Sequence, residues 1–132
     1  MTDGARPPRV AILADDLNWA TRLGSIVRLA GAEAVPASAL VAFEVGLAGA
    51  DGAIVDLSVR GSDPFAAIGA ASAAGIAVVA VGPHEDAPAR KRALASGASR
   101  VFAYRKLYED GPRAIATWLG LPTPARPGVR VG

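Results

Sequence analysis

Short apolar runs alternate with helical segments along most of the chain, and this alternation constrains the fold more than any other feature. The runs are short and end abruptly at polar residues or glycine, as expected of strands buried on both faces of a parallel sheet. The predicted strands cover residues 10–14, 34–37, 51–57, 76–81 and 100–104. The predicted helices cover residues 17–30, 38–47, 63–74, 86–96 and 112–119. This pattern favours a doubly wound α/β domain with a five-strand parallel sheet.

Capping residues and glycines mark the ends of these helices. Asp63 followed by Pro64 is typical of a helix N-cap and first position, and Asp86 can cap the next helix. Ser38 can cap the helix that runs to Leu47. Glycine follows four of the predicted helices, at Gly31, Gly75, Gly97 and Gly120.

Length and composition indicate one globular domain. A chain of 132 residues with 52% hydrophobic residues is long and apolar enough for a single core. We expect an N-terminal tail at 1–8, the domain at 9–120 and a flexible, proline-containing C-terminal tail at 121–132. No cysteine and a single histidine, His84, exclude disulfide scaffolds, thiolate metal sites and multi-histidine zinc sites.

Charge and hydropathy limit the partners. A formal net charge of +2 is too small to imply a nucleic-acid partner. No run reaches about 18 apolar residues without a charge, so we expect no membrane span. The first residues lack the apolar run of a signal peptide, so we expect a cytoplasmic protein.

Three carboxylates follow predicted strands. Asp15 and Asp16 end the first strand, and Asp56 ends the third. In a flavodoxin-like sheet of order 2-1-3-4-5 these strands are neighbours, so the carboxylates would share one cleft at their carboxyl ends. Such oxygen ligands suit Mg²⁺. The alternative is structural: Asp15 or Asp16 caps the following helix, and Asp56 caps a turn.

Three segments together resemble the receiver domains of response regulators, the CheY-like superfamily. Residues 12–16 resemble the first strand and acidic pair of these domains, and residues 53–57 resemble their third strand. Residues 93–99 resemble the end of their fourth helix and the turn into strand five. The resemblance extends from Arg9 to Leu119 and implies a flavodoxin-like three-layer (βα)5 fold.

The resemblance also implies a chemistry for the cleft. Asp56 would be the phosphoacceptor, and Asp15, Asp16, Asp56 and the main-chain carbonyl of Ser58 would hold Mg²⁺. In such a reaction the carboxylate attacks phosphorus in line while the metal neutralises charge on the transferring oxygens.

Four positions depart from the receiver pattern. Gly82 stands where receivers carry Thr or Ser, and Val101 stands where they carry an aromatic residue. Tyr104 falls at the end of strand five, where receivers carry Lys. Lys106 would share the face of Tyr104 if the strand ran on, and could then reach the cleft. These departures predict a degenerate receiver with impaired phosphorylation, because donors that stabilise transferring charge are absent.

The first hypothesis is therefore a stand-alone, receiver-like signalling module of the bacterial two-component type that acts by protein contact. Its partners would be a histidine kinase or a downstream effector, and the face formed by helix four, strand five and helix five is a candidate for a homodimer. We expect no enzyme activity beyond self-phosphorylation and dephosphorylation at Asp56. One alternative is a competent Mg²⁺-dependent phosphoacceptor. A second is a small flavodoxin-like nucleotide-binding or hydrolytic domain, although the sequence has no P-loop.

Overall fold

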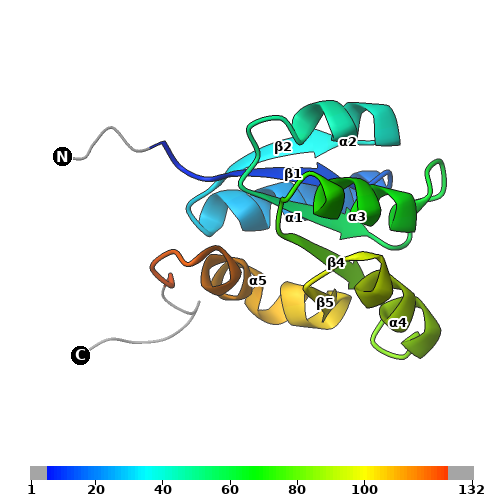
Figure 1. The fold of residues 1–132 in the computed structure, drawn as a ribbon. Coiled ribbons are helices and arrows are strands. Elements are labelled where there is room, and N and C mark those ends of the chain that lie inside the picture. Colours follow the sequence, from blue (N-terminus) through cyan, green and yellow to red (C-terminus); the bar gives the residue numbers. More distant parts are fainter. Residues whose placement is uncertain (1–5, 125–132) are drawn as a thin grey trace.

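The protein, in a computed structural model that describes residues 6–124, is built around a parallel sheet. The described residues form five strands in the order β2-β1-β3-β4-β5 (Figure 1), which confirms the predicted doubly wound topology. The strands are β1 (Arg9–Leu13), β2 (Glu33–Ala37), β3 (Gly52–Asp56), β4 (Val78–Gly82) and β5 (Arg100–Ala103). The helices are α1 (Leu17–Leu29), α2 (Leu40–Gly46), α3 (Pro64–Ala73), α4 (Ala87–Ser96) and α5 (Tyr104–Leu119).

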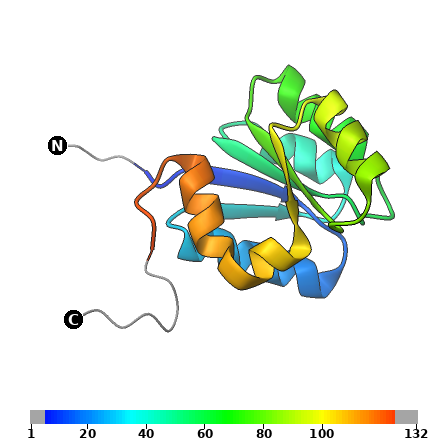
Figure 2. The same cartoon turned by 90° about the horizontal axis from the view of Figure 1, so that it is seen from below.

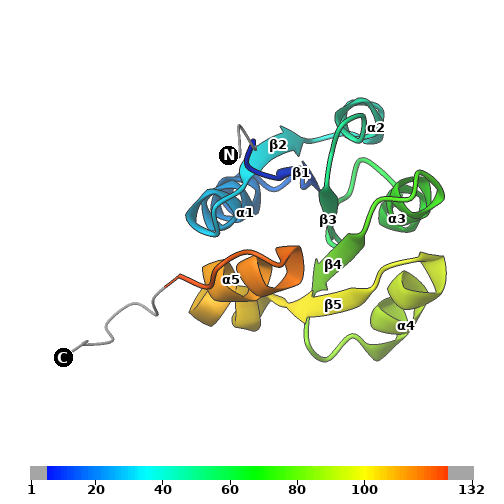
Figure 3. The same ribbon diagram turned by 60° about the vertical axis from the view of Figure 1, so that its left-hand side comes forward.

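Two helical layers cover the sheet, as Figure 3 shows, with α1 and α5 on one face and α2, α3 and α4 on the other. Alternate residues of each strand face opposite layers. Ile12 and Ile54 pack under α1 and α5, whereas Ala11, Leu13 and Val55 pack under the other three helices. None of the helices within residues 6–124 is both long enough and apolar enough to cross a membrane.

The predicted helix caps at Asp63 and Asp86 are confirmed. The Asp63 carboxylate accepts a hydrogen bond from the Phe65 N–H at 2.9 Å, and Asp86 accepts one from the Ala89 N–H at 3.1 Å. The glycines predicted to follow helices all have positive φ, which favours glycine because it has no Cβ: Gly31, Gly75, Gly97 and Gly120.

The predicted cap at Ser38 is wrong. The N-cap of α2 is Ala39, and it makes no side-chain capping bond. Instead, the Leu40 N–H donates to Ser62 Oγ at 3.0 Å, from the loop between β3 and α3. A residue distant in sequence therefore satisfies the helix terminus, which local pattern reading does not detect.

The predicted boundary between strand five and the last helix is also wrong. β5 ends at Ala103, and Tyr104 is the first residue of α5 instead of the last residue of a strand. Within α5, Asp110 has non-helical angles (φ −147°, ψ 31°), so the helix consists of two segments that meet at a kink. Pro112 explains the kink, because proline lacks an N–H and its ring clashes with the carbonyl four residues earlier.

Parts of both predicted tails lie within the described residues. The Pro8 carbonyl accepts a hydrogen bond from the Glu33 N–H at 2.8 Å. Leu121 packs against the core, and the Pro124 carbonyl accepts a hydrogen bond from Arg113 at 3.1 Å. The rest of the predicted tails, residues 1–5 and 125–132, lies outside the described residues.

Candidate functional site

A cleft of about 360 Å³, which we call the acidic cleft, lies at the carboxyl ends of β1 and β3. Its walls come from the ends of these two strands, the first turn of α1, the loop after β3 and the first residue of α5. The lining residues are Asp15, Asp16, Trp19, Asp56, Ser58, Arg60 and Tyr104. The structure thus places the three predicted carboxylates in the lining of one cleft at this edge of the sheet.

Asp56 lies at the base of the acidic cleft and is 1% exposed. Its Oδ1 accepts hydrogen bonds from the Ser58 N–H, at 2.9 Å, and from the Tyr104 hydroxyl. Burial raises the pKa of the Asp56 carboxyl, and the hydrogen bonds from Tyr104 and Ser58 oppose this effect without cancelling it. The carboxylate is thus buried and already engaged by a phenol.

Tyr104 enters the cleft from the start of α5. Its hydroxyl bonds Asp56 Oδ1 and also makes a hydrogen bond of 2.5 Å with Ser58 Oγ. Its ring packs on Trp19 of α1, with 4.6 Å between ring centroids and an angle of 37° between ring planes. Burial and the bond to Asp56 raise the pKa of Tyr104 above its usual range, so the phenol remains a hydrogen-bond donor.

Asp15 and Asp16 have local structural roles. Asp16 is the N-cap of α1, where its Oδ1 accepts a hydrogen bond from the Trp19 N–H at 3.0 Å. Asp15 Oδ2 accepts bonds from the N–H groups of Arg60, at 2.8 Å, and Gly61, at 2.9 Å. These bonds lower the pKa of Asp15, with that from Gly61 contributing most. The structural alternative is thus confirmed for Asp16, while Asp15 ties the end of β1 to the loop after β3.

The three carboxylates line one cleft but do not form a metal-ligand set. Asp15, Asp16 and Asp56 each accept hydrogen bonds from different donors. Within the described part of the chain, no group of three acidic or histidine side chains is placed to hold a metal ion. Each carboxylate thus has its own hydrogen-bond donors, and the Mg²⁺ site that includes the main-chain carbonyl of Ser58 stays a prediction.

Gly82 and Val101, two of the four positions that depart from the receiver pattern, lie in β4 and β5. Gly82 ends β4 and is buried. A Cβ built on Gly82 would lie 3.0 Å from Leu57 Cδ1, so the Leu57 side chain fills the space beside it. Val101, in β5, packs on the sheet face covered by α4, whereas Tyr104 packs on the opposite face.

The prediction that Lys106 could reach the cleft is wrong. Because the chain turns into α5 at Tyr104, Lys106 lies on a helix instead of an extended strand. Its Nζ is 3.5 Å from Asp110 Oδ2, and its side chain is 52% exposed. Lys106 lines a separate shallow hollow, together with Arg100 and Arg113. Arg60, which sequence analysis did not identify, is therefore the cation that lines the acidic cleft among the described residues.

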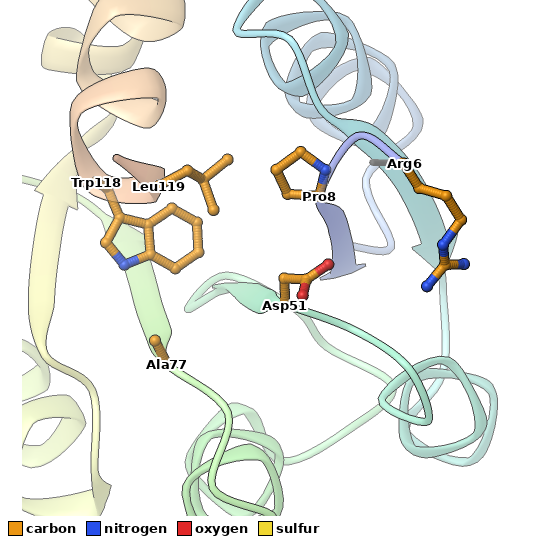
Figure 4. Close-up of a pocket in the computed structure, with 6 residues that line it drawn as sticks. All are labelled: Arg6, Pro8, Asp51, Ala77, Trp118 and Leu119. Carbon is orange, nitrogen blue, oxygen red and sulfur yellow. The ribbon is translucent and has the colours of Figure 1, made fainter. Parts of the chain in front are cut away.

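A second hollow, of about 320 Å³, lies at the opposite edge of the sheet. Figure 4 shows it between the end of α5 and the segments that precede β1, β3 and β4. Trp118 lines it and packs, partly buried, against the core. Asp51 also lines it, and its carboxylate accepts a hydrogen bond from the Arg9 N–H at 2.9 Å. No predicted site residue lies there.

Comparisons with known proteins identify the fold. No protein-family model matches the chain, and no curated protein matches it in sequence. Solved structures do match. A CheY-like response regulator receiver domain protein from Methanospirillum hungatei JF-1 has a TM-score of 0.70 and 17% identity, over 87% of this chain and 95% of that chain.

Two further receiver domains agree with this match. The signal receiver domain of a DNA-binding response regulator from Colwellia psychrerythraea 34H has a TM-score of 0.72 and 20% identity, over 86% of this chain and 98% of that chain. The receiver domain of the Francisella response regulator 1452 has a TM-score of 0.69 and 13% identity, over 86% of this chain and 93% of that chain. The chain, with its parallel sheet of order 2-1-3-4-5, therefore has the fold of CheY-like response-regulator receiver domains.

Proposed function

We propose that the protein is a receiver-like module of two-component signalling that acts through protein contact, with an acidic cleft that Tyr104 keeps closed at Asp56. The observation that carries this proposal is the pair of hydrogen bonds from the Tyr104 hydroxyl to Asp56 and Ser58. In this arrangement the residue at the phosphoacceptor position is buried and bonded, so phosphorylation of Asp56 is impaired.

The charge of the cleft supports impaired phosphotransfer. A phosphoryl donor is an anion, and its transfer needs cationic or hydrogen-bonding groups that stabilise charge on the transferring oxygens. Three carboxylates and one arginine, Arg60, line this cleft. Lys106 points to Asp110 instead, and Gly82 offers no hydroxyl. Loss of one such stabilising donor costs about 3–4 kcal/mol in other enzymes, so the loss of two would make transfer very slow.

The outer surface supports a role in protein contact. Several large apolar side chains of the helices are exposed: Leu17, Leu29, Val41, Val45, Leu94 and Tyr108. Single exposed apolar residues are ordinary on a protein surface, but Leu17 and Tyr108 lie along one groove between α1 and α5. A histidine kinase or a downstream effector is the partner class proposed, and a cytoplasmic location and a homodimer through α4, β5 and α5 belong to the same proposal.

The test is an intact mass measurement after incubation with Mg²⁺ and acetyl phosphate, beside an Asp56→Ala variant as control. We expect no phosphoryl group on the native chain, with both proteins folded by circular dichroism. Addition of one phosphoryl group to the native chain and not to Asp56→Ala would contradict the proposal. That outcome would identify a competent phosphoacceptor.

A further inference from the structure

A continuous line of ring and cation contacts connects the acidic cleft to the outer surface between α1 and α5. Tyr104 packs on Trp19, and the Arg22 guanidinium lies 5.9 Å from the centre of the Trp19 ring. The same guanidinium lies 4.3 Å from the centre of the Tyr108 ring. Two residues of α1, Trp19 and Arg22, thus lie between Tyr104 and Tyr108 of α5 in this line. In each helix the two residues are three or four positions apart, so they are neighbours on one helix face.

Trp19 is the wall between two hollows. It lines the acidic cleft, and it also lines a groove of about 850 Å³ that Leu17, Arg22, Leu107 and Tyr108 border, which we call the α1–α5 groove. Figure 2 shows the first part of α5 running beside α1, where this groove lies. The groove opens to the surface, because Leu17 is 81% exposed and Tyr108 is 67% exposed. A substitution of Trp19 therefore changes the lining of both the acidic cleft and the α1–α5 groove.

The segment that carries Tyr104 meets the rest of α5 at a kink. The non-helical angles at Asp110 interrupt the helix, so residues 104–109 form a segment distinct in direction from the turns that follow. Leu107, which is buried, anchors this segment in the core. Tyr104 and Tyr108 of the same segment contact Trp19 and Arg22 of α1.

We propose that Trp19 is a positioning residue for the closed cleft: its ring keeps the Tyr104 hydroxyl hydrogen-bonded to Asp56. Arg22, which contacts the rings of both Trp19 and Tyr108, connects this position to the α1–α5 groove. The state of the cleft is thereby coupled to an exposed surface. This inference rests on the proposed function, in which Tyr104 closes the cleft.

The test measures how accessible the Asp56 carboxyl is in the folded, full-length chain. The protein is labelled with a water-soluble carbodiimide and glycine ethyl ester, and peptide mapping by mass spectrometry gives the extent of labelling at Asp56. Exposed Glu44 on α2 is the internal reference. The variants are Tyr104→Ala, Trp19→Leu and Trp19→Phe, with Val45→Ala on the opposite helical layer as matched control.

We expect Tyr104→Ala and Trp19→Leu to increase Asp56 labelling, the latter by roughly threefold to tenfold, the change in population that loss of an aromatic contact produces. Trp19→Phe retains a ring and should restore protection, and Val45→Ala should match the native chain. If Trp19→Leu does not fold, the double variant Arg22→Ala and Tyr108→Ala, which alters exposed side chains only, should give the same increase.

The outcomes separate this inference from the proposed function. Labelling of Asp56 in Tyr104→Ala but not in Trp19→Leu would overturn the positioning role and leave the closure by Tyr104 intact. Equal labelling of Asp56 in Trp19→Phe and Trp19→Leu would also overturn it, because the ring contact would then have no effect on the position of Tyr104. Protection of Asp56 in Tyr104→Ala itself would contradict the closed cleft of the proposed function.

Discussion

Asp56 ends β3 with a buried carboxylate, and the hydrogen bonds it accepts do not fully compensate for the loss of water. Burial therefore keeps its pKa above the ordinary value of 3.8. The folded protein then binds the proton more tightly than the unfolded chain does. The contribution of this group to stability is accordingly full below the ordinary pKa and is lost as the pH rises through the raised pKa.

Asp56→Asn tests this electrostatic cost. The amide keeps an acceptor oxygen for Tyr104 and Ser58 but carries no charge. We expect the variant to have a larger free energy of unfolding at neutral pH, and the gain to disappear as the pH falls below the ordinary pKa of Asp. Urea unfolding across this pH range measures the difference, with exposed Glu44→Gln as control. A gain that did not depend on pH would contradict this account.

Gly82 and Leu57 form a packed pair at the end of β4, and this pair makes a second prediction. A serine hydroxyl at Gly82 would force the Leu57 side chain to move, since a Cβ already comes within 3.0 Å of it. We expect Gly82→Ser to destabilise the fold by about 1–3 kcal/mol, the usual cost of overpacking. The double variant Gly82→Ser and Leu57→Ala should be more stable than the sum of the two single changes predicts. Strict additivity in chemical denaturation would show that the two side chains do not compete for space.

At the scale of helices and strands, the sequence predicted best the strands that are buried on both faces of the sheet. The apolar runs of β1, β3 and β4 are buried along nearly their whole length, so their pattern alone identified them and placed Asp15 and Asp56 in one cleft. The start of α5 was missed because Pro112 suggested a helix beginning there. Leu107 and Ala114, both buried and two helical turns apart, were the signal that could have extended the helix back to Tyr104.

Only part of the acidic cleft could be predicted from the sequence. The positions of the carboxylates follow from strand order, which is a property of the pattern. The contact between Trp19 and Tyr104 depends instead on how α1 packs beside α5, and the bond from Tyr104 to Asp56 depends on that packing. Likewise, the backbone donors of Arg60 and Gly61 that occupy Asp15 come from a loop conformation that no local motif specifies.

The helix caps give a prediction at this scale with a built-in control. Asp63→Ala removes the acceptor for the Phe65 and Ala66 N–H groups at the start of α3, so we expect a loss of about 0.5–2 kcal/mol. Ser38→Ala removes an exposed hydroxyl that caps no helix and should change stability by less than about 0.5 kcal/mol. Thermal unfolding of the two variants makes the comparison. A cost at Ser38 equal to that at Asp63 would restore the cap that the structure does not show.

At the scale of the whole molecule, charge is distributed unevenly. Between residues 90 and 113 the sequence has seven Lys and Arg residues and two acidic residues, all on α4, β5 and α5. The cations are Arg90, Lys91, Arg92, Arg100, Arg105, Lys106 and Arg113. The acidic cleft lies at the ends of β1 and β3. The face proposed for a homodimer is therefore the basic face of the molecule.

This asymmetry determines how salt should act on self-association. A two-fold symmetric dimer brings the same patch of each copy together, so α4, β5 and α5 would bring cations against cations. We expect association to strengthen as salt shortens the Debye length from about 30 Å at low ionic strength to about 8 Å at physiological ionic strength. Sedimentation equilibrium at the two salt concentrations measures this. The variant Arg90→Ala with Lys91→Ala should associate more tightly than the native chain at low salt. Association that weakened with salt would instead indicate that the basic face meets an acidic surface, such as the acidic cleft of another copy. Such a head-to-tail contact joins two different surfaces and does not form a two-fold symmetric dimer.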